Sequence, residues 1–229
     1  MSPDSDTIVI VSAYNEADRL GDTLAAVGRA FPGAQVLVAD DGSKDATPHV
    51  ALQAGAELVR SPRTIGKGGA TTAAAERVLA RAHEPDPPLF VLCDGDLGET
   101  AEQLPALARL ARDDECDIAM GTFARRVGGG LGTAVNFSRW ASRTLGGLEL
   151  TTPLSGQRAI RGEVLPALLP FAPRFGMETG MNIDAGRAGF RVVEVELDLA
   201  HRATGKTLRG FIHRGRQLKD MSAAYLARR

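Results

Sequence analysis

Short apolar runs alternate with stretches of helical periodicity through the first half of this chain. The run at 7–13 (TIVIVSA) is rich in β-branched residues and shows no polar alternation, which is typical of a strand buried on both faces of a parallel sheet. The pattern predicts strands at 7–13, 36–39, 57–60, 89–93 and 117–122, with helices at 16–30, 45–54, 68–82 and 102–112. Because parallel strands need crossover helices, we expect an α/β domain whose mostly parallel sheet carries helices on both faces.

The second half continues the pattern with less regularity. A glycine-rich loop is predicted at 125–133, helices at 136–145, 162–169 and 178–188, a strand at 191–196, and a further helix after Thr207. No internal repeat or low-complexity linker interrupts the 229 residues. The sequence therefore predicts a single domain that spans residues 1–229.

Composition and charge exclude several classes of protein. A net charge of −1 and an aromatic content of 5% argue against a nucleic-acid partner. Cys93 and Cys116 are too far apart to form a ligand-spaced pair, which indicates a reducing compartment and no zinc site. No apolar run approaches the roughly 20 residues of a membrane span, and no signal peptide is recognisable, so we expect a cytoplasmic protein.

Basic residues gather in a C-terminal tail, residues 206–229. From His201 onward the chain has eight lysines and arginines and one acid, Asp220. Leu208, Phe211 and Ile212 are interleaved with them. Such a tail suits an anionic ligand or peripheral contact with the inner face of a membrane, and a solvated basic helix is an equal alternative.

Three polar clusters follow predicted strands, where parallel sheets bind their ligands. In the D-x-D motif Asp94-Gly95-Asp96, two carboxylates can turn toward one divalent cation bound to a diphosphate. Asp40 and Asp41 can accept hydrogen bonds from a base or a ribose. In the stretch 66–69 (GKGG), backbone N–H groups at a helix start and the charge of Lys67 favour an anion. The spacings of a P-loop and of a dinucleotide-binding G-x-G-x-x-G are both missing, so neither class is predicted.

The order of these clusters after Asn15-Glu16 resembles the nucleotide-sugar-binding half of GT-A glycosyltransferases of the family 2 type. The resemblance covers about residues 7–125 and implies the Rossmann-like GT-A fold. It also implies a diphosphate near Lys67 and a bound Mg²⁺ or Mn²⁺ at Asp96, which makes Asp96 an expected catalytic residue. The residues that it places around the donor are Ala13, Tyr14, Glu16, Asp41, Lys67 and Asp94.

Motifs of the second half resemble, in their order, the glucosyl-3-phosphoglycerate synthases, which are retaining GT-A enzymes. These motifs are FARR at 123–126, the glycines 128–130, PLSGQRA at 153–159, FGME at 175–178 and His201-Arg202. The resemblance implies that His201 joins Asp96 on the metal and that Glu178 lies beside the donor sugar as a catalytic residue. It implies an acceptor-binding half at about 126–205, with acceptor contacts from Arg125, Gly129, Gly130, Thr133 and Arg158.

The expected activity is metal-dependent sugar transfer from a nucleotide-sugar, with uridine favoured as the base and guanosine second. The synthases carry arginine, arginine and asparagine where Leu131, Leu199 and Ala203 stand here. The SGQR element also resembles the SGFR of polyprenyl-phosphate sugar transferases. The acceptor is therefore left open between a phosphoglycerate-like molecule and a polyprenyl phosphate, and a homodimer is also compatible with this class.

Two other functions are compatible with the same fold. A sugar-phosphate nucleotidyltransferase would also use metal-bridging aspartates, but it usually carries a basic glycine-rich loop where SAYNE stands here, at 12–16. A non-catalytic nucleotide-sugar-binding module would bind a donor without turnover. An anionic acceptor needs no general base, whereas a hydroxyl acceptor would use Glu178.

Overall fold

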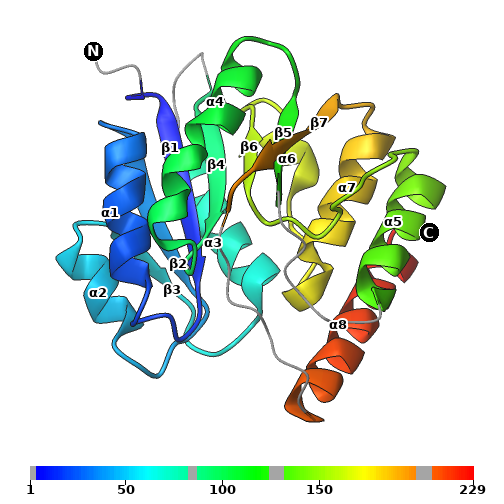
Figure 1. The fold of residues 1–229 in the computed structure, drawn as a ribbon, viewed down its shortest axis with the longest axis horizontal. Helices are drawn as coiled ribbons and strands as arrows, with labels where there is room; N and C mark the ends of the chain where they lie inside the picture. The colour runs from blue at the N-terminus through cyan, green and yellow to red at the C-terminus, as the bar shows by residue number, and fades with distance from the viewer. Residues whose placement is uncertain (1–3, 82–86, 124–131, 200–207) are drawn as a thin grey trace.

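One mixed sheet forms the centre of the molecule (Figure 1). The computed structural model describes residues 4–81, 87–123, 132–199 and 208–229, with 208–214 as backbone only. Its strands are β1 (Thr7–Ala13), β2 (Gln35–Asp40), β3 (Glu57–Arg60), β4 (Leu89–Asp94), β5 (Ile118–Phe123), β6 (Arg158–Ile160) and β7 (Val192–Leu197). Their order within this described part is β3-β2-β1-β4-β6-β5-β7, and β6 alone runs antiparallel to its neighbours. The predicted α/β domain with a mostly parallel sheet is confirmed.

Helices connect the strands at the predicted intervals. They are α1 (Leu20–Ala30), α2 (Thr47–Gln53), α3 (Lys67–Leu79), α4 (Pro105–Arg112), α5 (Thr133–Gly146), α6 (Leu165–Leu168), α7 (Met177–Arg187) and α8 (Leu208–Leu226), with 3-10 turns η1 (Gly98–Gln103) and η2 (Arg174–Gly176). In the described part of the chain, no helix combines the length and the hydropathy that a membrane span requires.

Three sequence expectations are corrected. The helix predicted at 102–112 is divided into η1 and α4, where Pro105 begins a new helix because proline favours the first turn. The helix predicted at 162–169 shrinks to the four residues of α6, followed closely by Pro170. Strand β6 was not predicted, because three residues are too few to show a periodicity.

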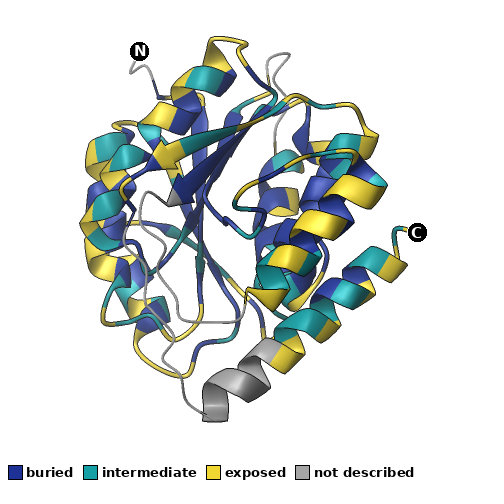
Figure 2. Ribbon diagram, turned by 45° about the vertical axis from the view of Figure 1, so that its right-hand side comes forward, coloured by how far each residue is buried: buried dark blue, intermediate teal, exposed yellow. Residues whose placement is uncertain are grey.

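Two clusters of buried apolar side chains cover the two faces of the sheet. The strands of the sheet are accordingly coloured mostly as buried in Figure 2. Val9 and Val11 of β1 point into one cluster, which α1, α2 and α4 complete. Ile8 and Ile10 point to the opposite face, into a cluster completed by α3, α6 and α7. This alternation is what a strand buried on both faces requires, so the interpretation of 7–13 is confirmed.

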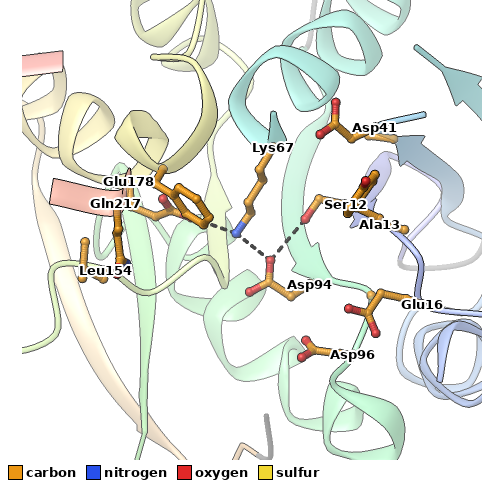
Figure 3. Close-up of a pocket in the computed structure, with 14 residues that line it drawn as sticks. Ser12, Ala13, Glu16, Asp41, Lys67, Asp94, Asp96, Leu154, Glu178 and Gln217 are labelled. Atoms are coloured by element: carbon orange, nitrogen blue, oxygen red, sulfur yellow. Dashed lines mark hydrogen bonds and ion pairs between the residues drawn. The ribbon is translucent and has the colours of Figure 1, made fainter. Parts of the chain in front are cut away.

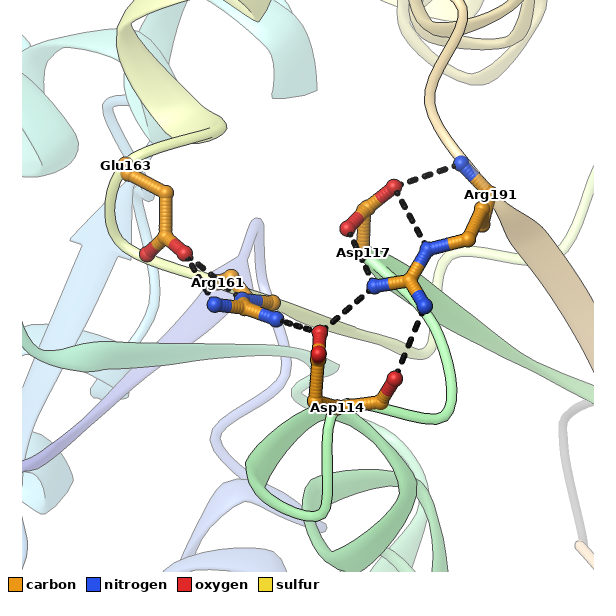
Figure 4. A network of polar contacts seen from close by, with 5 residues as sticks. All are labelled: Asp114, Asp117, Arg161, Glu163 and Arg191. Atoms are coloured by element: carbon orange, nitrogen blue, oxygen red, sulfur yellow. Dashed lines mark hydrogen bonds and ion pairs between the residues drawn. The ribbon is translucent and has the colours of Figure 1, made fainter.

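A network of charged residues joins the sheet at the edge where β5 begins (Figure 4). Arg191 donates to Asp117 at 2.9 Å and to Asp114 at 2.6 Å, and Arg161 pairs with Asp114 and with Glu163. These side chains connect the starts of β5 and β7 with the end of β6. They lie at the opposite end of the strands from the polar clusters singled out in the sequence.

Helices α5, α7 and α8 lie side by side as a layer beside the sheet (Figure 1). Close approach between α5 and α7 requires glycine, because a Cβ on Gly186 would lie 1.9 Å from the carbonyl oxygen of Gly146. The C-terminal end of α8 is fixed to α7 by Arg228, whose Nε and Nη2 both lie 2.7 Å from an oxygen of Asp184.

Gly186→Ala is expected to lower the free energy of unfolding by about 1–3 kcal/mol, because the added methyl group overpacks the contact with α5. Gly28→Ala is the matched control: Gly28 lies exposed on α1, where a Cβ would have no atom within 4 Å, and the substitution should gain about 0.5–1 kcal/mol. Urea unfolding measures both. Equal effects at the two positions would contradict the close approach of α5 and α7.

Candidate active site

A cavity of about 450 Å³ opens at the carboxyl ends of β1, β2 and β4 (Figure 3). All six predicted donor-binding residues line it, together with both predicted catalytic residues. The lining residues are Ser12, Ala13, Tyr14, Glu16, Ala39, Asp41, Lys67, Asp94, Gly95, Asp96, Leu154, Phe175, Glu178 and Gln217. Among the predicted residues that the structure gathers into this cavity, Ala13 and Glu178 are 165 positions apart in the chain.

Lys67 is the central charge of this cavity. Its Nζ lies 2.6 Å from Oδ1 of Asp94 and 2.8 Å from Oε1 of Glu178. Burial by itself lowers the pKa of Lys67, but the two carboxylates outweigh it and hold the pKa well above its ordinary value. Burial likewise raises the pKa of Asp94, and Lys67 outweighs it, so that pKa lies below its ordinary value. Lys67 and Asp94 are therefore a pair of opposite charges at neutral pH, and Lys67 also contacts the carboxyl group of Glu178.

Two further side chains orient Asp94. Ser12 donates to Oδ1 at 3.2 Å, and the amide of Gln157 donates to Oδ2 at 3.0 Å. Gly156, which precedes Gln157, lies against the ion pair of Lys67 and Asp94. A Cβ at this position would lie 2.3 Å from Nζ of Lys67, so the backbone can approach this closely only because the residue is glycine. The sequence singled out SGQR without identifying these contacts, which depend on the pairing of β6 with β4.

Asp41 shapes the entrance to α3. Its carboxylate accepts the backbone N–H groups of Ile65 at 2.7 Å and of Gly66 at 2.8 Å. Gly66 has a φ of 91°, in the region that favours glycine. Asp40, which the sequence grouped with Asp41, is instead buried, pairs with Arg60 at 3.1 Å and accepts the N–H of Ser43. Asp41 faces the cavity and Asp40 supports the strand end.

The metal-ligand prediction rests on Asp96, which lines the cavity beside Asp94 (Figure 3). Within the described ranges no group of three or more His, Cys, Asp or Glu side chains gathers to hold a metal. His201 lies outside the described residues. Cys93 stands behind the site, where burial raises the pKa of its thiol well above the ordinary value. Metal binding by Asp96 and His201 therefore stays a prediction.

The predicted acceptor residues are dispersed. Arg125, Gly129 and Gly130 lie outside the described residues, and Thr133 is the exposed first residue of α5. Arg158 is 1% exposed on β6 and lines neither this cavity nor the neighbouring one. Acceptor binding by this set stays a prediction.

Glu194 on β7 fixes the loop that leads to SGQR. Its two carboxylate oxygens accept the backbone N–H groups of Thr151 and Thr152 at 2.8 and 2.7 Å, and both threonine hydroxyls at 2.7 and 3.0 Å. Burial raises the pKa of Glu194, but these donors outweigh it and hold the pKa below the ordinary 4.5. The loop that supplies Leu154 and Gln157 to the site is thereby anchored to the far strand of the sheet.

Comparison with known proteins gives consistent matches. The model of the family described as glycosyl transferase family 2 matches residues 8–154. The undecaprenyl-phosphate mannosyltransferase of Micrococcus luteus is 32% identical over 87% of this chain and 86% of its own length. The dolichyl-phosphate hexose transferase of Haloferax volcanii is 31% identical over 86% of this chain and 84% of its own length. A solved structure of glucosyl-3-phosphoglycerate synthase from Mycobacterium tuberculosis, in complex with Mn²⁺, UDP and phosphoglyceric acid, shares the fold with a TM-score of 0.78, at 24% identity over 97% of this chain and 78% of that one.

Glu194→Gln is expected to lower the free energy of unfolding by about 1–2 kcal/mol at neutral pH, because hydrogen bonds to a charged, partly exposed acceptor are weakened. The folded pKa is lowered, so the stabilisation is present above about pH 4.5 and is lost as the pH falls through the folded value. Glu196→Gln, exposed on the same strand, is the control. Urea unfolding at several pH values measures both. A difference in unfolding free energy between wild type and Glu194→Gln that does not change with pH would contradict the stabilisation of the loop by the Glu194 carboxylate.

Proposed function

The chain belongs to glycosyl transferase family 2, and from this premise we propose that it transfers a sugar from a nucleotide-sugar to a phosphorylated acceptor, with Mg²⁺ or Mn²⁺ at Asp96. Membership of this family favours transfer over the nucleotidyltransferase and the non-catalytic module. One observation carries the proposal: the six residues expected around the donor, with Asp96 and Glu178, line a single cavity at the strand ends. Ligands of open α/β sheets bind at this edge.

The donor nucleoside would lie over the ends of β1 and β2. Ala13, Tyr14, Glu16 and Asp41 line this part of the cavity. Carboxylates there can accept hydrogen bonds from ring N–H groups of a base or from ribose hydroxyls. The complex of the synthase holds UDP, which supports uridine as the favoured base, with guanosine second.

The donor diphosphate would lie at the start of α3. Lys67 is the first residue of this 13-residue helix, so its charge adds to that of the helix N-terminus. Its side chain is 27% exposed, which leaves it accessible from the cavity. Binding of a diphosphate there would draw Lys67 away from one or both of its carboxylate partners.

Asp96 fits a divalent cation, because Mg²⁺ in such sites is commonly held by one or two carboxylates together with substrate phosphates. His201 is the proposed second protein ligand. When bound, the metal neutralises negative charge on the leaving diphosphate. Asp94, oriented by Ser12 and Gln157, supports the ribose or the metal from the adjacent position.

Glu178 would stand on the sugar side of the cavity, opposite the nucleoside. A phosphate acceptor is already anionic and attacks without a general base. In that case Glu178 would serve to orient the donor sugar. With a hydroxyl acceptor it would accept the proton. Its ion pair with Lys67 connects this side of the cavity directly to the diphosphate side.

Among phosphorylated acceptors we favour a polyprenyl phosphate. The mannosyltransferase and the hexose transferase compared above are both named for lipid-phosphate acceptors. A second cavity of about 550 Å³ shares Lys67 and Glu178 with the first, and its lining includes the cationic Arg174, Arg216 and Lys219. Of these, Arg216 and Lys219 belong to the tail at 206–229, and they support peripheral contact of a cytoplasmic protein with the inner face of a membrane. Residues 126–205 remain the proposed acceptor half, and a homodimer remains compatible with the proposal.

Thermal unfolding with UDP-glucose or GDP-mannose, each with and without Mg²⁺ or Mn²⁺, tests the donor site. One donor is expected to raise the Tm only with metal, because binding at ~100 times the Kd adds about 2.7 kcal/mol. Asp96→Ala should lose the metal-dependent part, whereas Glu99→Ala, which removes an exposed carboxylate three residues away, should keep it. An unchanged shift in Asp96→Ala, or no shift with any donor, would refute the site.

Transfer of radiolabelled sugar to polyprenyl phosphate in detergent tests the acceptor, with 3-phosphoglycerate in a parallel reaction. We expect label in the organic phase with the lipid and little product with the small acid. Sedimentation should show binding to anionic vesicles at low salt, weakened at high salt and absent with neutral vesicles. Transfer to 3-phosphoglycerate alone would reverse the acceptor assignment and leave the transferase assignment intact.

A further inference from the structure

Arg158 is a buried cation whose hydrogen bonds are incomplete. Its side chain is 1% exposed, and its Nε donates to the carbonyl of Ser155 at 3.2 Å. Its Nη2 is buried and has no hydrogen-bond partner among the described residues. Burial lowers the pKa of Arg158 to about 10, opposed by the charges of Glu178 and Glu194, so the guanidinium still carries its charge at neutral pH. A buried guanidinium costs free energy of folding unless an opposite charge or hydrogen bonds compensate it.

Glu178 contacts one cation, and its charge acts on a second. Lys67 lies 2.8 Å from it, whereas Arg158 has no ion pair with any described carboxylate. Arg158 follows Gly156 by two residues, and the backbone of Gly156 lies against Nζ of Lys67. Glu194, the other acid near Arg158, is already satisfied by four hydrogen bonds from Thr151 and Thr152. Arg158 therefore has an unused N–H group, and Glu178 is the other carboxylate whose charge acts on it.

The two cations differ in what a donor would do to them. Lys67 is accessible from the cavity and lies where the diphosphate is proposed, whereas Arg158 lies behind the wall and has no contact with the cavity. When Lys67 turns to the diphosphate, Glu178 loses its direct partner and becomes a nearly buried carboxylate that needs another positive charge.

We propose that Arg158 is a positioning residue for Glu178, which replaces Lys67 as its cationic partner when the donor diphosphate engages Lys67. The inference rests on the proposed function for the identity of the donor. The exchange of partners is inferred from the contact of Lys67 with Glu178 and from the buried, unpartnered Nη2 of Arg158. Arg158 then holds Glu178 oriented toward the sugar while Lys67 neutralises the leaving group. Its buried position separates this role from direct contact with an acceptor.

Thermal unfolding without any ligand tests the exchange, with Lys67→Met standing for the donor-engaged state. Arg158→Met is expected to lower the Tm by about 3 °C more in the Lys67→Met background than in the wild type, since it then leaves Glu178 without a cation. Adding Glu178→Gln should abolish this difference, and Arg158→Lys should reduce it.

Arg161→Met is the matched control. Arg161 pairs with Asp114 and Glu163, so the loss of Tm that this substitution causes should be equal in both backgrounds. Equal costs for Arg158→Met in both backgrounds would overturn the proposal.

Steady-state kinetics provide the second test. Arg158→Met should lower kcat about tenfold or more with little change in the donor KM, and Arg158→Lys should restore most of kcat. A raised acceptor KM with unchanged kcat would overturn the proposal in favour of acceptor binding. If the wild type transfers no sugar, the proposed function fails, whereas the unfolding experiment still decides whether Arg158 and Glu178 are coupled.

Discussion

The ion pairs of Lys67 hold together three parts of the chain that the sequence separates widely. One end of α3, the end of β4 and the start of α7 meet where Nζ lies 2.6 Å from Asp94 and 2.8 Å from Glu178. Charges removed from water must be paired, so none of these elements can move away without leaving an uncompensated charge. The glycine at 156 follows from the same constraint, because only a residue without a side chain lets its backbone approach the pair.

This charged centre is set into an apolar framework that is stabilised elsewhere. Clusters on both faces of the sheet supply most of the buried apolar surface, and the network around Arg191 closes the opposite end of the strands. Buried ion pairs contribute little net stability compared with apolar packing of the same volume. The ion pairs of Lys67 with Asp94 and Glu178 are therefore better explained by binding of a charged ligand than by stability of the fold.

Much of the cavity lining at the strand ends could be predicted from the sequence. The carboxyl ends of parallel strands lie at one edge of the sheet, and the polar clusters around Asp41 and Asp94 directly follow such strands. This rule and local motifs were enough to single out Asp41, Lys67 and Asp94, and the resemblance to GT-A glycosyltransferases supplied their expected roles. The contacts of Gln157, Arg158 and Glu194 could not be found in the same way. They arise from a three-residue antiparallel strand and from side chains of β7, and neither leaves a periodic signal.

The two sides of the cavity are also mounted on different parts of the fold. Asp41 and Asp94 stand at strand ends, whereas Glu178 stands on α7, which packs on α5 through Gly186 and Gly146 and is fixed to α8 by Arg228. Glu178 is therefore positioned by the helical layer, whereas Asp41 and Asp94 are positioned by the sheet. Lys67 contacts carboxylates from both supports, so its position fixes the spacing between the two sides of the cavity.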